Sequence, residues 1–124
     1  MSTSYPGIDL VEIARFAESV ERQGEPFLKR LFTPSELAYC RRFADPLPHY
    51  AARFAAKEAV AKALECGIGE HLSWHDVEVG HTATGSPTVT LSERAQKRFG
   101  DPHLTLSLSH SRTLATAIVI RNKP

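Results

Sequence analysis

The segment at residues 53–64, RFAAKEAVAKAL, constrains the fold more than any other part of the chain. Its residue types have high helix propensity, so it predicts a helix from about residue 49 to residue 65 that ends at Gly67. Because small side chains let a helix approach its neighbour, we expect one face of this helix to pack closely on a β-sheet. That face consists of Ala52, Ala56, Ala59, Val60 and Ala63.

The other side of this helix carries charges whose purpose the helix pattern does not decide. Glu58 and Lys62 form an i,i+4 pair, which on a solvated helix contributes only about 0.2–0.5 kcal/mol. Arg53 and Lys57 form a like-charge i,i+4 pair, which is easier to understand if an anion lies between the two side chains. The helix alone favours the interpretation that these charges are solvated surface groups. It leaves open a second interpretation in which Glu58 is the carboxylate of a metal site.

Residues 9–23 predict another helix, because their apolar side chains recur at helical spacing. Asp9 precedes this run and is a candidate N-cap, and Gly24 is a typical helix end. Upstream, Ile8 can anchor a short strand, and Pro6 restricts such a strand to a sheet edge or a strand start because proline has no N–H. Capping would explain Asp9 fully, so its residue type alone does not assign it a chemical role.

A third helix is predicted between these two segments. Residues 33–36, TPSE, match a capping box with Thr33 as the N-cap and Glu36 at the reciprocal position. We expect this helix to run to about Phe43, where the two prolines of the ADPLP segment end it.

The second half of the chain has the pattern of antiparallel strands. Residues 76–79 and 87–91 alternate as a strand pair, with TATGS as the turn between them. Residues 92–99 predict a short helix, and residues 103–109 and 114–120 predict a second hairpin. Helices precede strands, so the fold class is α+β, with N-terminal helices packed on an antiparallel sheet.

Composition limits the class of protein. The 124 residues fit a single domain spanning 1–124, and the hydrophobic content of 42% and charged content of 23% are those of a globular protein. A net charge of +1 argues against a nucleic-acid-coating protein. No signal-peptide pattern and no apolar run of about 20 residues is present, so we expect a soluble, cytoplasmic protein without a membrane partner. Cys40 and Cys66 lack a CxxC spacing and are expected to be free thiols.

Several histidines are further candidates for a site. His110 follows a predicted strand in SLSHSRT, where Ser109 and nearby backbone N–H groups would suit an anion, although a polar turn histidine without a role is the more common case. His71 and His75 have an i,i+4 spacing known from zinc sites. Because they lie in a loop that enters a strand, we do not expect them to bind zinc.

The ordered motifs of the chain resemble one family, the small holo-acyl-carrier-protein synthases of the 4'-phosphopantetheinyl transferase superfamily. The segments that carry the resemblance are GIDLVEIARF (7–16), LFTPSELAYC (31–40), RFAAKEAVAKALECGIG (53–69), LSWHDVEV (72–79), GSPTVTL (85–91) and LSLSHSRTLATAIVI (106–120). Segments 53–69 and 106–120 together are the most specific.

The resemblance implies a fold, a reaction and partners. It implies the 4'-phosphopantetheinyl transferase fold and a magnesium-dependent enzyme that supports fatty acid biosynthesis. Such an enzyme moves the phosphopantetheine arm of coenzyme A to a serine of apo-acyl carrier protein and releases adenosine 3',5'-bisphosphate. The family is typically a homotrimer with active sites between neighbouring subunits.

The resemblance also implies residue roles. Asp9 and Glu58 match the Mg²⁺ ligands, and Glu58 and Lys62 match the catalytic residues. The residues implied in coenzyme A binding are Arg53, Lys62, Gly67, Ser109 and His110, and those implied in carrier docking are Arg15 and Arg22. The general base stays open between Glu58 and a metal-coordinated water. Two rival interpretations are a carrier-binding module without chemistry and a small nucleotide-binding domain.

Overall fold

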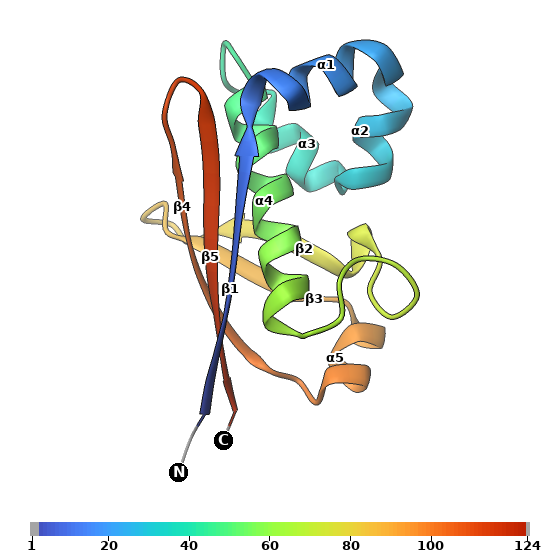
Figure 1. Ribbon diagram of the computed structural model, residues 1–124, viewed down its shortest axis with the longest axis vertical. Coiled ribbons are helices and arrows are strands. Elements are labelled where there is room, and N and C mark those ends of the chain that lie inside the picture. Colours follow the sequence, from blue (N-terminus) through green and yellow to red (C-terminus); the bar gives the residue numbers. More distant parts are fainter. Residues whose placement is uncertain (1–2, 124) are drawn as a thin grey trace.

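A three-stranded antiparallel sheet is crossed on its inner face by the longest helix of the protein (Figure 1). The computed structural model describes residues 3–123. In chain order its elements are β1 (Thr3–Glu12), α1 (Ile13–Gln23), α2 (Glu25–Leu31), α3 (Pro34–Cys40), α4 (Leu47–Ala63), the 3-10 turn η1 (Trp74–Asp76), β2 (Val77–His81), β3 (Pro87–Leu91), α5 (Glu93–Phe99), β4 (His103–His110) and β5 (Leu114–Lys123). The predicted α+β class is confirmed.

The two predicted hairpins are confirmed, and the first strand joins the second hairpin. The larger sheet has the order β1-β5-β4, and β2 pairs with β3 in a separate two-stranded sheet. Strand β1 lies at an edge of this sheet, so Pro6, which pairs with Ile120, occupies an edge strand as predicted for a residue without an N–H. Strands β1 and β5 run antiparallel along their whole length, which brings both ends of the described chain to the same end of the sheet (Figure 1).

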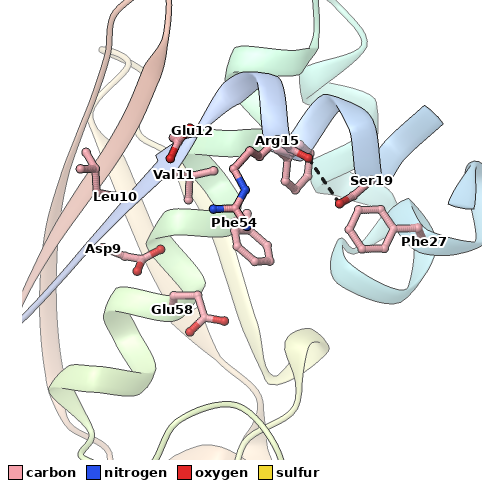
Figure 2. Close-up of a pocket in the computed structure, with 10 residues that line it drawn as sticks. Asp9, Leu10, Val11, Glu12, Arg15, Ser19, Phe27, Phe54 and Glu58 are labelled. Atoms are coloured by element: carbon pink, nitrogen blue, oxygen red, sulfur yellow. Dashed lines mark hydrogen bonds between the residues drawn. The ribbon is translucent and has the colours of Figure 1, made fainter. Parts of the chain in front are cut away.

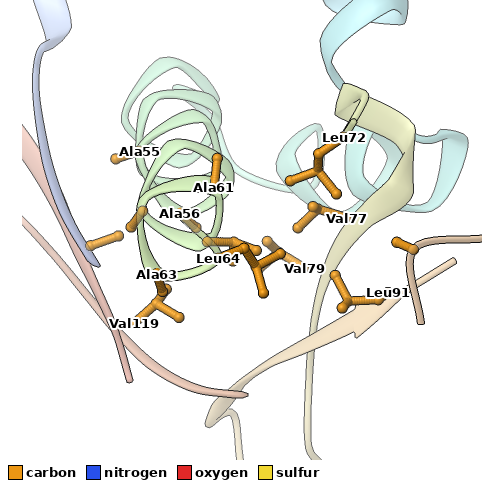
Figure 3. Close-up of a cluster of buried hydrophobic side chains, with 14 residues drawn as sticks. Ala55, Ala56, Ala61, Ala63, Leu64, Leu72, Val77, Val79, Leu91 and Val119 are labelled. Carbon is orange, nitrogen blue, oxygen red and sulfur yellow. The ribbon is translucent and has the colours of Figure 1, made fainter. Parts of the chain in front are cut away.

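Helix α4 is the centre of the core, as its alanine face predicts. Ala56, Ala59 and Ala63 are fully buried, and α4 packs against β1 and β5. On its other side, Leu72, Val77, Val79 and Leu91 approach it from the smaller sheet and the loop before it (Figure 3). The approach to β1 is so close that a Cβ at Gly7 would lie 2.0 Å from the Ala59 carbonyl oxygen. Glycine is therefore required at this position by space.

The predicted start of the first helix is wrong. The residues from Asp9 to Glu12 continue β1, where Asp9 pairs with Ala117, and α1 begins only at Ile13. Glu12 is the N-cap and makes no side-chain cap bond, so Asp9 does not cap a helix. Apolar spacing at residues 9–12 fits a helix, but backbone pairing with β5 satisfies more hydrogen bonds and decides the local structure. Gly24 ends α1 as predicted.

The other helix predictions differ from the structure mainly at their ends. The capping box of Thr33 and Glu36 is confirmed, but α3 ends at Cys40 rather than near Phe43. Helix α4 begins at Leu47 with a proline in its first turn, where a missing N–H costs no helical hydrogen bond. Helix α2 was not predicted, because its seven residues are too few to show a helical period and its N-cap, Gly24, offers no side-chain cap.

A buried ion pair connects α4 to the smaller helices. Lys57 Nζ lies 2.7 Å from Glu36 Oε1, both side chains are fully buried, and Lys57 Nζ also donates to the carbonyl oxygens of Leu31 and Trp74. The same carboxylate accepts hydrogen bonds from the backbone N–H groups of Thr33 and Val79. The anion that the sequence suggested near Lys57 is thus a protein carboxylate, and every charge of this pair is compensated.

Replacing Lys57 with methionine should strongly destabilise the fold, because it leaves the Glu36 carboxylate buried without a counter-ion. We expect the free energy of unfolding to fall by about 3–5 kcal/mol in urea denaturation. Lys97→Met is the matched control, since Lys97 pairs with Glu93 at 3.5 Å on the surface, where an ion pair contributes at most about 1 kcal/mol. Equal effects of the two substitutions would contradict a structural role for the buried pair.

Candidate active site

Two carboxylates from distant parts of the chain meet beside α4. Asp9 lies on the inner face of β1, two residues after Gly7, and Glu58 neighbours the Ala59 that Gly7 contacts. Figure 2 shows both carboxylates on the same side of the β1–α4 contact. The close packing at Gly7 therefore sets the position of this carboxylate pair.

The carboxylate pair is electrostatically coupled. Partial burial raises the pKa of Glu58 above its ordinary value, the negative charge of Asp9 raises it further, and Lys62 opposes the shift. A second positive charge in the site would stabilise both ionised carboxylates. Two hard oxygen donors with an excess of negative charge fit a divalent cation such as Mg²⁺, which takes one or two protein carboxylates and fills its remaining positions with phosphate oxygens and waters.

Lys62 completes this group, but it pairs with Asp9 and not with Glu58. Its Nζ donates to Asp9 Oδ1 at 3.0 Å and to the carbonyl oxygen of Ile8 at 2.8 Å. The sequence-based i,i+4 pair with Glu58 is therefore wrong: within residues 3–123, no cation lies at ion-pair distance from that carboxylate. The Lys62 side chain is 52% exposed, so its ammonium remains accessible to an incoming anion.

A cavity of about 420 Å³ opens next to the carboxylates (Figure 2). Asp9 and Glu58 line one end of it, and Arg15 and Ser19 of α1 line the other. Its apolar wall includes Phe16, Phe27 and Phe54. Arg15 thus borders the same opening as the carboxylates, whereas Arg22 lies exposed on the last turn of α1. The cavity combines a carboxylate end suited to phosphate chemistry with an apolar wall suited to contact with a second molecule.

The residues that the resemblance assigned to the nucleotide lie elsewhere. Arg53 is buried, with its guanidinium carbon 4.2 Å from the centre of the Tyr39 ring. His110 is exposed at the end of β4, and Ser109 lies on the outer face of the sheet opposite Thr116. Gly67 follows α4 in a left-handed conformation with φ of 70°.

Helix α4 separates these residues from the carboxylates. Asp9 lies on the edge strand β1, and His110 lies on the opposite edge strand β4, with β5 between them. Glu58 and Arg53 project from α4 about 140° apart. Within one chain, the structure therefore brings together Asp9, Glu58, Lys62 and Arg15, and it holds Arg53 and His110 on another side of the helix.

Several residues around Arg53 were not predicted from the sequence. His49 and Tyr39 form part of its surroundings, and His81 Nδ1 lies 3.5 Å from Arg53 Nη2. The i,i+4 spacing of His49 and Arg53 on one helix was the only available signal. Tyr39 and His81 come from α3 and β2, and nothing in their local sequence marks them.

Neither a larger metal-ligating cluster nor a membrane-spanning helix is found in residues 3–123. That part of the chain contains no group of three or more histidine, cysteine, aspartate or glutamate side chains arranged to hold a metal. Among the described helices, none has the length and apolar character needed to cross a membrane. Cys40 and Cys66 are free thiols as predicted.

Comparisons with known proteins agree with the resemblance seen in the motifs. The family model described as the 4'-phosphopantetheinyl transferase superfamily matches residues 5–119. The chain is 43% identical over 120 residues to the holo-[acyl-carrier-protein] synthase of Chlamydia felis, with 97% of this chain and 98% of that protein covered. It is 44% identical over 121 residues to the synthase of Geobacter sulfurreducens, with 95% and 96% covered.

Solved structures give the same result. The Helicobacter pylori synthase, crystallised in complex with coenzyme A, is 38% identical and superposes with a TM-score of 0.87, with 94% of this chain and 98% of that chain covered. The Neisseria meningitidis synthase is 31% identical with a TM-score of 0.89, with 96% and 98% covered. Motifs, fold and near-full-length identity agree, and the chain belongs to the holo-[acyl-carrier-protein] synthases of the 4'-phosphopantetheinyl transferase superfamily.

Proposed function

We propose that the protein transfers the 4'-phosphopantetheine arm of coenzyme A to a serine of apo-acyl carrier protein. The observation that carries this proposal is the group of Asp9, Glu58 and Lys62 beside an open cavity, in a chain whose relatives are synthases of this kind. The products are holo-acyl carrier protein and adenosine 3',5'-bisphosphate. We assign the reaction to the cytoplasm and to fatty acid biosynthesis, and we treat residues 1–124 as one catalytic domain.

The chemistry is a phosphoryl transfer. The serine oxygen attacks the phosphorus that bears the pantetheine arm, and the bond from that phosphorus to the bridging oxygen of the pyrophosphate breaks. Asp9 and Glu58 would hold Mg²⁺, which when bound supplies charge neutralisation at the pyrophosphate. The half-exposed ammonium of Lys62 adds positive charge at the same point.

The serine proton needs an acceptor near the carboxylates. Glu58 is a candidate because its carboxylate lines the cavity in which the serine would react. A water molecule in the site is the alternative acceptor. Arg53, His110, Ser109 and Gly67 are assigned to the nucleotide end of coenzyme A, away from the reacting phosphorus.

Carrier docking is proposed for α1. Acyl carrier proteins are acidic, and Arg15 and Arg22 would orient such a partner during the encounter. Because Arg15 lines the same cavity as Glu58, a carrier held on α1 has its serine close to the carboxylates. The alternative of a carrier-binding module without chemistry is disfavoured by the intact group of Asp9, Glu58 and Lys62.

We further propose a homotrimer with active sites between subunits. The outer face of the larger sheet exposes a row of apolar side chains, with Ile8 60%, Leu10 62% and Ile118 40% exposed. Exposed apolar side chains that lie together in this way favour burial against another protein surface. Assembly would also bring the Arg53 and His110 side of one subunit to the carboxylates of the next, which a single chain separates by α4.

Removing either carboxylate charge should abolish transfer while the protein stays folded. We expect Asp9→Asn and Glu58→Gln each to lower kcat/KM on the order of 100-fold or more, because both remove a metal-binding charge. The mass of an apo-carrier protein incubated with coenzyme A and Mg²⁺ reports the reaction. Glu93→Gln, which removes an exposed carboxylate on α5, is the control and should stay within about twofold of wild type. Wild-type protein that modifies none of several apo-carriers would refute the proposed function.

Glu58→Gln should also change the pH dependence of stability in a defined direction. The pKa of Glu58 is raised in the folded state, so its carboxylate ionises less readily there than in the unfolded chain. Ionisation therefore disfavours folding once the pH rises above the ordinary pKa of a glutamate. The variant should therefore have an equal or higher Tm than wild type at neutral pH, and the difference should vanish below about pH 4. A lower Tm of the variant at neutral pH would mean that Glu58 supports the fold.

Ile118→Glu should dissociate the proposed trimer, because it introduces a charge at the centre of the apolar face. Light scattering should give about three times the chain mass of 13.7 kDa for wild type and the mass of one chain for the variant. Ala83→Glu in the exposed β2–β3 turn should leave the mass of the assembly unchanged. A wild-type protein that is monomeric at the concentrations used for activity would refute assembly as a requirement.

A further inference from the structure

Arg53 lies in a cluster of aromatic and basic side chains that comes from four elements and from the loop after α3. We call it the His49 cluster. Its members are Tyr39, Phe43, His49, Arg53, His81 and His110. The family resemblance assigned two of these residues, Arg53 and His110, to the nucleotide, and it assigned nothing to the others.

The Arg53 guanidinium is buried without a protein anion. The residue is 4% exposed, its face is covered by Tyr39, and its buried Nε–H has no hydrogen-bond partner. Within residues 3–123, no carboxylate lies at ion-pair distance from it. A buried charge without a counter-ion costs several kcal/mol, so this side chain is prepared for an anion from outside the chain.

His49 is held next to this charge in a fixed orientation. Its ring stacks on Phe43 with centroids 3.6 Å apart and an interplanar angle of 15°. On another side it meets the His110 ring edge-on at a centroid distance of 5.5 Å. Two contacting imidazoles and the nearby guanidinium can together neutralise a dianion, and the exposed aromatic ring of Phe43 offers a surface for a purine base.

The protonation of His49 is sensitive to an added anion. Burial lowers the pKa of His49, and the neighbouring His110 and Arg53 lower it further, while Asp45 in the loop before α4 opposes the shift. The Tyr39 hydroxyphenyl ring of α3 also packs against His49, at a centroid distance of 6.5 Å. An entering phosphate would reverse the repulsion from the two cations and favour the imidazolium.

We propose that His49 is a third anion-binding residue, which acts with Arg53 and His110 on the 3'-phosphate of the nucleotide and so selects coenzyme A over its dephosphorylated form. The inference rests on the proposed function and adds to it a specificity-determining residue. His49 takes up a proton when the phosphate binds, so the affinity for coenzyme A falls as the pH rises. It does not touch the reacting phosphorus, so the pH dependence that His49 contributes lies in KM and not in kcat.

The test compares two nucleotides by titration calorimetry on the full-length, assembled protein. Adenosine 3',5'-bisphosphate carries the 3'-phosphate and adenosine 5'-monophosphate lacks it. We expect His49→Phe, which keeps the stacking on Phe43, to weaken binding of the bisphosphate about tenfold and to leave the monophosphate unchanged. His49→Gln should behave in the same way and guards against a packing defect of the first variant. His103→Phe, at an exposed position of β4, is the control.

Proton uptake on nucleotide binding is a second measurement, and it would not change if His49 had only a structural role. Titrations at pH 7.5 in buffers of different ionisation enthalpy should show proton uptake on bisphosphate binding to wild type and a smaller uptake with either His49 variant. Unchanged discrimination and unchanged uptake in both variants would overturn the assignment of His49 alone. Wild-type protein that binds no bisphosphate and modifies no carrier would overturn the proposed function as well.

Discussion

The contact between β1 and α4 is the constraint on which the rest of the structure depends. Gly7 has no side chain, and the facing residues of α4 are alanines, so the strand backbone reaches the helix backbone at Ala59. This approach brings the Ile8 carbonyl oxygen and the Asp9 carboxylate within hydrogen-bond reach of Lys62. A larger side chain at either surface would move the strand outward, and the carboxylates of Asp9 and Glu58 would separate.

Helix α4 distributes its charges over sides that serve different purposes. Lys57 points into the core and is fully compensated by Glu36, so it stabilises the packing of the small helices. Glu58 and Lys62 face β1, where their partial exposure leaves them available to a cation and to phosphates. Arg53 is buried without a counter-ion beside His49 and His81. One helix thus contributes to the core, to the candidate metal site and to the proposed nucleotide site.

The separation of the two groups by α4 gives a physical reason for assembly. A molecule as long as coenzyme A has its pyrophosphate and its 3'-phosphate at different places, and one chain presents the groups proposed for them on different sides of a helix. The outer sheet face adds exposed isoleucine and leucine side chains that an assembly would bury. Under the proposed trimer, the association of subunits would both bury these side chains and complete the active site.

The sequence by itself determined the elements whose signals are local. Apolar periodicity, the Thr33–Glu36 capping box and the alternating leucines of β4 gave α4, α3 and the second hairpin, and the motif pattern identified the family. Only the tertiary structure decided that Asp9 belongs to a strand and that Lys62 pairs with it, and it alone joined Tyr39, His81 and His49 around Arg53. Propensity acts over a few residues, whereas strand pairing and side-chain contacts join residues far apart in the chain, so their outcome depends on the whole fold.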